Sequence, residues 1–300
     1  MKVIGIDLGG TKIIGGIIDE VGNMEQPIAV PTPTQLGREG ILNALNHIIE
    51  QLLSREREDI QAIGIGSAGR IDRATGRVLY ATDNLPNWTG TEVKLLLEAA
   101  HRLPVYVDND VNAAALGEIW LGSACDLDHF MFVTLGTGVG GALIHNRQVI
   151  AGPQGGAGDI GHMILYPGGH PCNCGQRGCL EQYVSGTALN LFARQVNPQW
   201  NSRILMDKYT ESEPKSSQII QKFITDLSTA FASLNNLYEP QRIVIGGGIM
   251  DTHILWWDHL LAAVRQTASQ PLELLPAQLG VKSGMLGAAR LALDGLAELQ

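Results

Sequence analysis

The sequence predicts an α/β protein of two domains, and three observations lead to this fold class. Short apolar runs typical of buried strands alternate with longer segments whose apolar residues recur at helical spacing. Two of the runs enter a glycine-rich turn and continue into another apolar run, at residues 2–18 and 130–144. The length of 300 residues is enough for two domains with complete cores. The repeated strand–turn–strand plan indicates two related halves.

The composition is that of a soluble globular protein. Hydrophobic residues make up 45% of the chain and charged residues 17%. The net charge of −9 argues against general binding to nucleic acid. Apolar runs stay short of the roughly 18 residues that a membrane span needs, and the first strand begins without a targeting segment. We therefore expect a cytoplasmic protein with neither nucleic-acid nor membrane partners.

The first strand–turn–strand unit combines an aspartate with a glycine turn. A strand over residues 2–8 carries Asp7 and is followed by Gly9-Gly10-Thr11-Lys12, and a second strand covers residues 13–18. Glycines let backbone N–H groups approach an anion, so this turn can face a phosphate. A carboxylate beside the turn is well placed to hold Mg²⁺ through water. The alternative for Asp7 is an ordinary turn-opening aspartate.

Helices are predicted over residues 40–55 and 91–103, the second capped by Thr91. Between them, a strand over residues 61–66 runs into Ser67-Ala-Gly69-Arg70. Small residues at the end of a strand leave room for a ligand, to which Arg70 can donate hydrogen bonds. A solvated turn arginine is the alternative.

A strand over residues 105–107 ends in Asp108-Asn109-Asp110, before a helix over residues 111–120. Ligands of open α/β sheets bind beyond the carboxyl ends of strands. A carboxylate there can accept the proton of a hydroxyl that attacks phosphorus, while Asn109 holds neighbouring hydroxyls. The alternative is that Asp110 caps the helix, although three consecutive polar residues exceed what a cap needs.

The second glycine turn matches G-x-G-x-x-G at Gly136, Gly138 and Gly141. A dinucleotide fold requires a helix directly after this motif. Residues 142–150 instead indicate a strand and a turn, and residues 152–158 are too rich in glycine for a helix. We interpret the segment as a second phosphate-facing turn between strands, with a plain hairpin turn as the alternative.

One histidine and three cysteines follow within a short, turn-rich segment: His162, Cys172, Cys174 and Cys179. Three thiolates and an imidazole make a closed tetrahedral zinc site, which would be structural. Disulfides are disfavoured because no secretory signal is visible and the fourth cysteine, Cys125, lies in another segment. Three unrelated buried thiols are the remaining alternative.

The C-terminal part adds helices and a third glycine turn. Residues 197–217 are polar and weakly patterned, which indicates a surface excursion or a mobile loop. A buried strand over residues 242–245 ends in Gly246, Gly247 and Gly248, where the backbone can approach a flat ligand such as adenine. Helices are predicted over residues 187–196, 218–238, 254–268 and 286–299.

Taken together, the chain resembles the ROK family of sugar kinases over nearly its whole length. The motifs are Asp7-Leu-Gly-Gly-Thr-Lys12, residues 108–118, residues 135–141, Gly161-His162, residues 172–181 and residues 245–248. The resemblance implies an actin-like ATPase (ribonuclease H-like) fold of two α/β domains, with ATP and sugar in a cleft between them. The sugar-side domain would be residues 1–118, completed by a helix over residues 286–300. Residues 119–285 would carry the zinc loop and the nucleotide contacts.

The resemblance also implies roles for single residues. Asp110 would be the catalytic base, and the sugar ligands would be Gly69, Arg70, Asn109, Asp159, His162 and Glu181. ATP and Mg²⁺ would be held by Asp7, Gly9, Gly10, Thr11, Lys12, Gly136, Thr137, Gly138, Gly246, Gly247 and Gly248. His162 would use one ring nitrogen for Zn²⁺ and the other for the sugar. Asp159 departs from the family pattern, which has glutamate there.

Further expectations concern the substrate and the class of protein. The family's reaction phosphorylates the 6-hydroxyl of a hexose with ATP. The segment Ser67-Ala-Gly-Arg70 resembles that of N-acetylmannosamine kinases, and glucose is the alternative substrate. A homodimer is implied. A sugar-responsive repressor would carry an N-terminal helix-turn-helix extension, which we do not expect here because the strand of Asp7 begins at residue 2 and the net charge is acidic. A binding module without catalysis is disfavoured by the retained Asp7, Thr11, Asp110 and second glycine turn.

Overall fold

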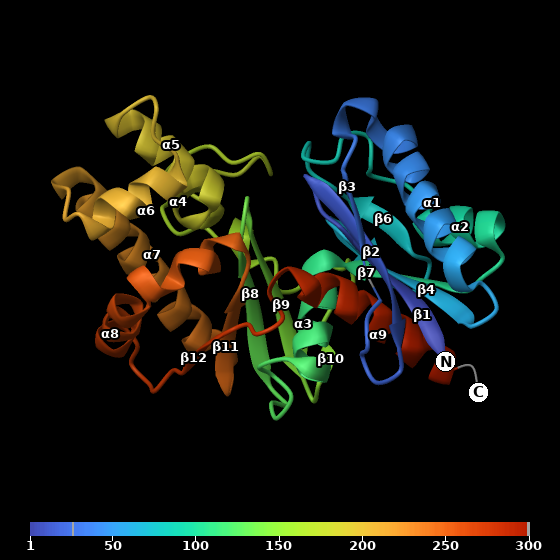
Figure 1. Cartoon of the computed structure of the whole chain (residues 1–300). Coiled ribbons are helices and arrows are strands. Elements are labelled where there is room, and N and C mark those ends of the chain that lie inside the picture. The colour runs from blue at the N-terminus through green and yellow to red at the C-terminus, as the bar shows by residue number, and fades with distance from the viewer. Residues whose placement is uncertain (26, 299–300) are drawn as a thin grey trace. The chain divides into compact units, whose positions relative to one another are not determined.

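The computed structural model of the chain describes residues 1–25 and 27–298 (Figure 1). The chain forms two compact units. The first contains Met1–Asp126, Gln148–Ala157 and Val281–Gln300, and the second contains Leu127–Arg147 and Gly158–Gly280. The last residues of the predicted C-terminal helix, 299 and 300, lie outside the described residues. Across the described ranges, none of the helices has the length and apolar character that a bilayer crossing requires.

The sheet of the first unit brings three strand ends to one edge. Its order is β3 (Ile28–Pro31), β2 (Lys12–Asp19), β1 (Lys2–Leu8), β4 (Ile60–Ser67) and β7 (Val105–Asn109). Strand β1 pairs antiparallel with β2 and parallel with β4, and β4 pairs parallel with β7. Ser67 lies in register with Leu8 on one side and Asn109 on the other. The segments that follow these strands therefore start at the same edge.

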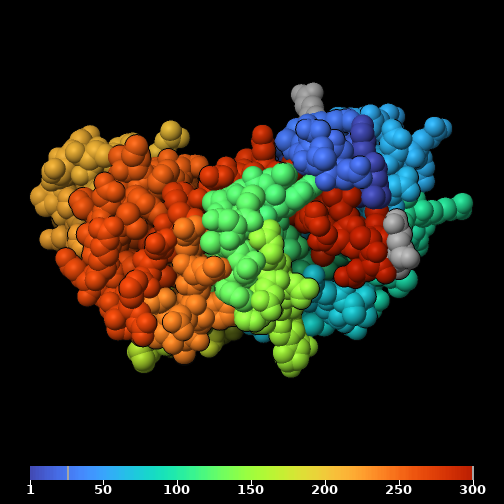
Figure 2. All heavy atoms as spheres, turned by 90° about the horizontal axis from the view of Figure 1, so that it is seen from below, coloured from blue at the N-terminus to red at the C-terminus, as the bar shows by residue number. Residues whose placement is uncertain are grey.

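The helices of the first unit are α1 (Gly37–Glu56), α2 (Val93–His101), α3 (Asp110–Leu121) and α9 (Ser283–Ala297). Strands β5 (Arg70–Asp72) and β6 (Arg77–Tyr80) form a separate hairpin. The prediction that Thr91 caps α2 is wrong, because the cap position is Glu92 and the Thr91 hydroxyl donates to the Trp88 carbonyl instead (2.6 Å). Helix α9 packs on β1 and β4, and Figure 2 shows its atoms, in red, beside N-terminal atoms in blue.

A second sheet repeats this plan. Its order is β10 (Gln148–Val149), β9 (Val139–His145), β8 (Phe130–Leu135), β11 (Arg242–Gly246) and β12 (Leu274–Pro276). The pair β8–β9 is antiparallel, and β8–β11 and β11–β12 are parallel. In both sheets the order is third, second, first, fourth and fifth strand along the chain. The prediction of two related halves is therefore confirmed for the sheet topology.

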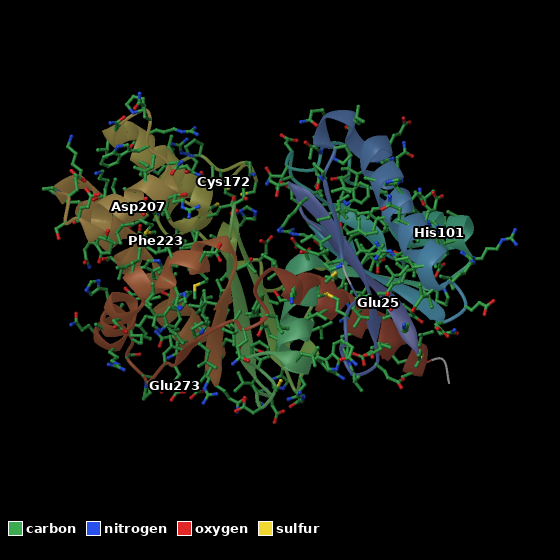
Figure 3. The ribbon with its side chains drawn as sticks, viewed as in Figure 1. Glu25, His101, Cys172, Asp207, Phe223 and Glu273 are labelled. Carbon is green, nitrogen blue, oxygen red and sulfur yellow. The ribbon has the colours of Figure 1, made fainter. Side chains whose placement is uncertain are left out.

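Helices α4 (Glu181–Val184), α5 (Gly186–Val196), α6 (Ser202–Thr210), α7 (Pro214–Tyr238) and α8 (Trp257–Thr267) pack in the second unit, with the 3₁₀ segment Gly248–Leu255 before α8. Phe223 of α7 lies in the core against Trp256, with ring centroids 5.3 Å apart (Figure 3). Of the two alternatives predicted for residues 197–217, the mobile loop is wrong, although most of the segment lies at the surface. That segment contains α6, which is capped by Asn201 and buries Leu205 and Met206.

Candidate functional site

Asn109 organises the corner between β7 and α3. Its side-chain oxygen accepts from the N–H groups of Val111 (2.9 Å) and Asn112 (3.1 Å), so Asn109 is the helix cap. Its amide nitrogen donates to the Gly69 carbonyl (2.8 Å) and to Oδ1 of Asp110 (2.9 Å). One side chain thus ends the strand, starts the helix and orients the Asp110 carboxylate.

Asp7 lies in the same unit as Asp110 and is coupled to it electrostatically. The pKa of Asp7 is raised to about 7, first by burial and then by the charge of Asp110, while Lys12 opposes the rise. The residue keeps some solvent exposure, but the start of α9 crowds its carboxyl. A Cβ at Gly284 would lie 2.7 Å from the Asp7 carboxyl carbon. Two carboxylates that disfavour each other's charge can accept a divalent cation.

The first glycine turn presents backbone N–H groups. Gly9 donates to the Lys12 carbonyl (3.1 Å), which closes the turn. Thr32 braces it, since its hydroxyl donates to the Gly9 carbonyl (2.7 Å) and its N–H to the Thr11 carbonyl (3.0 Å). The N–H groups of Gly10 and Thr11 have no partner within the described part of the chain. An anion can occupy that position.

The second glycine turn is held by the start of α5. The N–H of Gly186 donates to the Gly136 carbonyl (2.8 Å), and the Thr187 hydroxyl donates to the Thr137 carbonyl (2.8 Å). The carbonyls of the turn are therefore occupied, whereas the N–H groups of Thr137 and Gly138 have no partner among residues 1–25 and 27–298. Sequence reasoning missed Thr187, which it assigned only to the start of a helix.

Glu181 contacts this second turn directly. Its Oε2 accepts from the Val139 N–H (2.9 Å). A Cβ at Gly138 would lie 2.2 Å from the same oxygen, so the close approach requires glycine. The family resemblance implies that Glu181 is a sugar ligand and Gly138 a nucleotide ligand, but the sequence gives no sign that the two residues touch.

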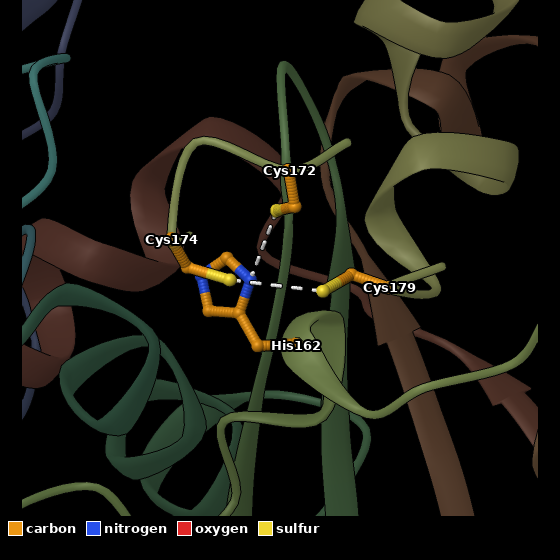
Figure 4. A group of neighbouring side chains, drawn as sticks. All are labelled: His162, Cys172, Cys174 and Cys179. Carbon is orange, nitrogen blue, oxygen red and sulfur yellow. Dashed lines mark hydrogen bonds between the residues drawn. The ribbon is translucent and has the colours of Figure 1, made fainter. Parts of the chain in front are cut away.

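His162, Cys172, Cys174 and Cys179 form one cluster, confirming that the four predicted ligands come together (Figure 4). Nδ1 of His162 lies 3.6 Å from Sγ of Cys172, and the sulfurs of Cys174 and Cys179 are 3.7 Å apart. Tetrahedral zinc with ordinary bond lengths would place nitrogen and sulfur about 3.6 Å apart and two sulfurs about 3.8 Å apart. The cluster therefore fits a metal of this geometry, and its cysteines form no disulfide.

The environment of the cluster also suits a cation. Burial, followed by the hydrogen bonds and charges of the neighbouring Cys174 and Cys172, raises the pKa of the Cys179 thiol to about 12. A bound metal ion would offset this cost, because thiols lose their protons on coordination. Side-chain amides of Gln176 and Gln182 lie 3.4 Å from the sulfurs of Cys174 and Cys172, respectively. Sequence reasoning missed both glutamines.

The other predicted residues lie at turns. Gly69 has φ +107° and precedes Arg70, whose guanidinium lies 5.6 Å from the centroid of the Tyr80 ring. Asp159 starts the 3₁₀ turn of His162, whose N–H donates to the Asp159 carbonyl (3.2 Å). Gly247, with φ +93°, packs against the Leu135 backbone between Gly246 and Gly248.

The predicted residues divide between the two units. The first contains Asp7, Gly9, Gly10, Thr11, Lys12, Gly69, Arg70, Asn109 and Asp110. The second contains Gly136, Thr137, Gly138, Asp159, His162, Cys172, Cys174, Cys179, Glu181, Gly246, Gly247 and Gly248. Each of the two units thus contains one hairpin with a glycine turn and its own set of polar side chains.

Comparison with known proteins gives consistent matches. The family model described as "ROK family" matches residues 3–295. A glucokinase of Streptomyces coelicolor is 34% identical over 316 aligned residues, covering 97% of each chain. An N-acetylmannosamine kinase of Shigella flexneri is 29% identical, covering 97% of this chain and 98% of that protein. A ROK family glucokinase from Streptomyces griseus, solved with glucose and AMPPNP, superimposes with a TM-score of 0.88 at 32% identity, covering 98% of this chain and 100% of the other.

Proposed function

Because the chain belongs to the ROK family and has the actin-like ATPase fold of its sugar kinases, we propose that it transfers the γ-phosphoryl group of ATP to the 6-hydroxyl of a hexose or N-acylhexosamine. The observation that carries the proposal is the corner of β7 and α3, where Asn109 orients the carboxylate of Asp110. A relative with 34% identity is a glucokinase, which supports sugar phosphorylation as the reaction class.

Asp110 is the general base of the proposed reaction. Its Oδ1 accepts from the Asn109 amide and the Val111 N–H (3.0 Å), which fix the plane of the carboxylate. The carboxylate accepts the proton of the sugar hydroxyl as the oxygen attacks the γ-phosphorus and the bond to the β-phosphate oxygen breaks.

The sugar ligands of the proposal come from several turns. Asn109, Glu181 and His162 are the proposed ligands of sugar hydroxyls, and Gly69, Arg70 and Asp159 are further proposed sugar ligands. Asp159 is one methylene shorter than the glutamate of the family pattern, so its contact with the sugar is longer or passes through water. Because Nδ1 of His162 faces Cys172, Nε2 is the nitrogen left for a sugar hydroxyl.

The nucleotide ligands are the three glycine turns. Unpartnered N–H groups of Gly10, Thr11, Thr137 and Gly138 bind phosphate oxygens, and Lys12 adds a positive charge. Asp7 holds Mg²⁺ through water, and the ion supplies charge neutralisation at the phosphates. Residues 246–248 lie beside the adenosine.

Zinc is the proposed metal of the cluster of His162, Cys172, Cys174 and Cys179, whose spacing fits tetrahedral coordination. With four protein ligands the ion is structural. It fixes the ring of His162, so that Nε2 keeps its orientation toward the sugar. The protein is further proposed to act in the cytoplasm as a homodimer.

N-acetylmannosamine is the first candidate substrate, because Ser67-Ala-Gly-Arg70 resembles the corresponding segment of N-acetylmannosamine kinases. Glucose is the second candidate, favoured by the 34% identity to a glucokinase against 29% to an N-acetylmannosamine kinase. A sugar-responsive regulator without kinase activity is the alternative within the family.

ADP release tests these candidates. Zinc-loaded protein is supplied with Mg²⁺ and ATP and with glucose, mannose, fructose, allose, N-acetylglucosamine or N-acetylmannosamine in turn. The proposal predicts one sugar with a kcat/KM far above the others. Turnover independent of sugar would contradict the assignment as a sugar kinase, and sugar binding without ADP release would favour the regulator.

A further inference from the structure

A buried carboxylate, Asp108, stands directly before Asn109 and Asp110 at the end of β7. Its side chain is 1% exposed. Its Oδ1 accepts from the Asn109 N–H (2.7 Å) and from the amide of Asn112 (2.9 Å). The proposed chemistry makes no use of this carboxylate, although a buried charge is expensive unless it is paired.

The partner of Asp108 is Arg73, in the turn between β5 and β6. Nε of Arg73 lies 3.0 Å from Oδ2 of Asp108. Within the described residues this oxygen accepts no hydrogen bond of good geometry, so the contact is a close ion pair. Burial raises the pKa of Asp108, and the Arg73 guanidinium is the strongest of the groups that lower it.

This ion pair joins two segments that carry proposed site residues. The β5–β6 hairpin begins with Arg70, directly after Gly69, and the β7–α3 corner carries Asn109 and Asp110. At one end of β5 the Asn109 amide donates to the Gly69 carbonyl (2.8 Å). Arg73 directly follows the other end of β5, and strand β5 packs against β7. The hairpin is therefore attached to the corner at both ends of β5.

We propose that Arg73 is a positioning residue, whose ion pair with Asp108 holds the β5–β6 hairpin in register with the corner that orients Asp110. The inference rests on the proposed function, since Asp110 is the base of that reaction. Without Arg73, Asp108 is left as a buried unpaired carboxylate, which must take up a proton or draw in water. Either change disturbs its bond to the Asn109 N–H, and Asn109 in turn holds Asp110.

Four variants test the role: R73M, R73K, D108N and the double variant R73M/D108N. The matched control is R77M, because Arg77 lies in the same hairpin, half exposed, with Nε 3.8 Å from a carboxylate oxygen of exposed Glu92. The readouts are kcat and the KM values for sugar and ATP, with the sugar that the wild-type protein turns over best.

We expect R73M to lower kcat by about 10- to 100-fold, because small displacements of a catalytic group have effects of this size. R73K recovers part of the loss. The kcat of the double variant exceeds that of R73M alone. The neutral amide that D108N introduces needs no charged partner, and its oxygen still accepts from the Asn109 N–H. The kcat of R77M stays within about twofold of the wild-type value, as expected for the loss of an exposed ion pair.

Hydrogen exchange provides a second readout that does not depend on turnover. R73M should speed the exchange of amides in residues 109–112, whereas R77M should not. Equal kcat in R73M and R77M, or a double variant no better than R73M, would overturn the inference. If the wild-type protein phosphorylates none of the sugars, the proposed function fails, and unchanged exchange of residues 109–112 in R73M would separately overturn the role of Arg73.

Discussion

At the scale of a single residue, Asp7 is a carboxyl group whose charged form the fold disfavours. Its carboxyl is crowded by the start of α9 and lies near the charge of Asp110. The native protein therefore holds the Asp7 proton more tightly than the unfolded chain does. The resulting stability is complete below the unfolded pKa of about 3.8 and is lost as the pH rises toward about 7.

We therefore predict that Asp7→Asn stabilises the protein in magnesium-free buffer at pH 8, and does so less at pH 5. Asparagine has nearly the same shape but no charge to bury, and the penalty it removes at pH 8 is on the order of a few kcal/mol. Thermal unfolding at both pH values measures the effect, without a chelator that would remove zinc. Equal shifts of Tm at the two pH values would contradict the account.

The contact of Gly138 with Glu181 gives a second prediction. In Gly138→Ala the added Cβ would lie 2.2 Å from Oε2 of Glu181, so the carboxylate must leave the Val139 N–H. We expect the sugar Kd to rise by about tenfold or more, the typical scale for disturbing a supporting contact.

Gly136→Ala is the matched control for this prediction. It belongs to the same turn, but a Cβ there meets nothing within 4 Å among the described residues. Sugar Kd values from calorimetry compare the two variants. If Gly138→Ala binds sugar as tightly as Gly136→Ala, Glu181 does not link the turn to the sugar.

The segment of Cys172, Cys174 and Cys179 shows how an element with little regular structure is held in place. Between the 3₁₀ turn Ile160–His162 and α4 the described chain forms only isolated bridges and turns. Side-chain anchors therefore replace a hydrogen-bonded ladder. Besides the cluster, Tyr166 donates to Asp226 of α7 (2.6 Å), which ties the other end of the segment to the core.

We predict about one equivalent of zinc per chain in the purified protein and its loss in Cys179→Ser. Without the ion, amides of residues 163–180 should exchange faster, and the sugar KM should rise by about tenfold or more because His162 loses its fixed orientation.

Cys125→Ser is the control for the zinc experiment, because Cys125 is exposed and outside the cluster. It should keep the metal and the sugar affinity. A zinc-free Cys179→Ser protein with the wild-type sugar KM would remove His162 from the proposed site.

Local chemistry explains which elements could be predicted from the sequence. The glycine turns after β1 and β8 and the turn-rich cysteine segment are visible because their residue types restrict the backbone nearby. Helix α6 could not be predicted because only Leu205 and Met206 are buried in its short pattern. The contacts of Arg73 with Asp108 and of Thr187 with Thr137 depend on packing between distant segments, which no spacing in the sequence encodes.

At the scale of the whole molecule, one sheet topology occurs twice, with different side chains around it. The first unit carries the carboxylates Asp7 and Asp110, and the second carries the thiol cluster and Glu181. In both, an antiparallel hairpin with a glycine turn is followed by parallel strands. Since phosphoryl transfer relies on positioning and charge stabilisation, repeated turns of this kind suit an enzyme that must hold several phosphates.

The turnover number of Asp110→Asn tests the central claim most directly. Asparagine keeps an oxygen to accept from Asn109 and Val111 but cannot take up the proton of the hydroxyl. The account predicts a kcat about 10²- to 10⁴-fold below wild type, with the sugar Kd nearly unchanged. The control is Asp59→Asn. Asp59 is exposed and directly precedes β4, so it lies at the edge of the sheet opposite to the one where β7 ends. A kcat of Asp110→Asn equal to that of wild type would contradict the account.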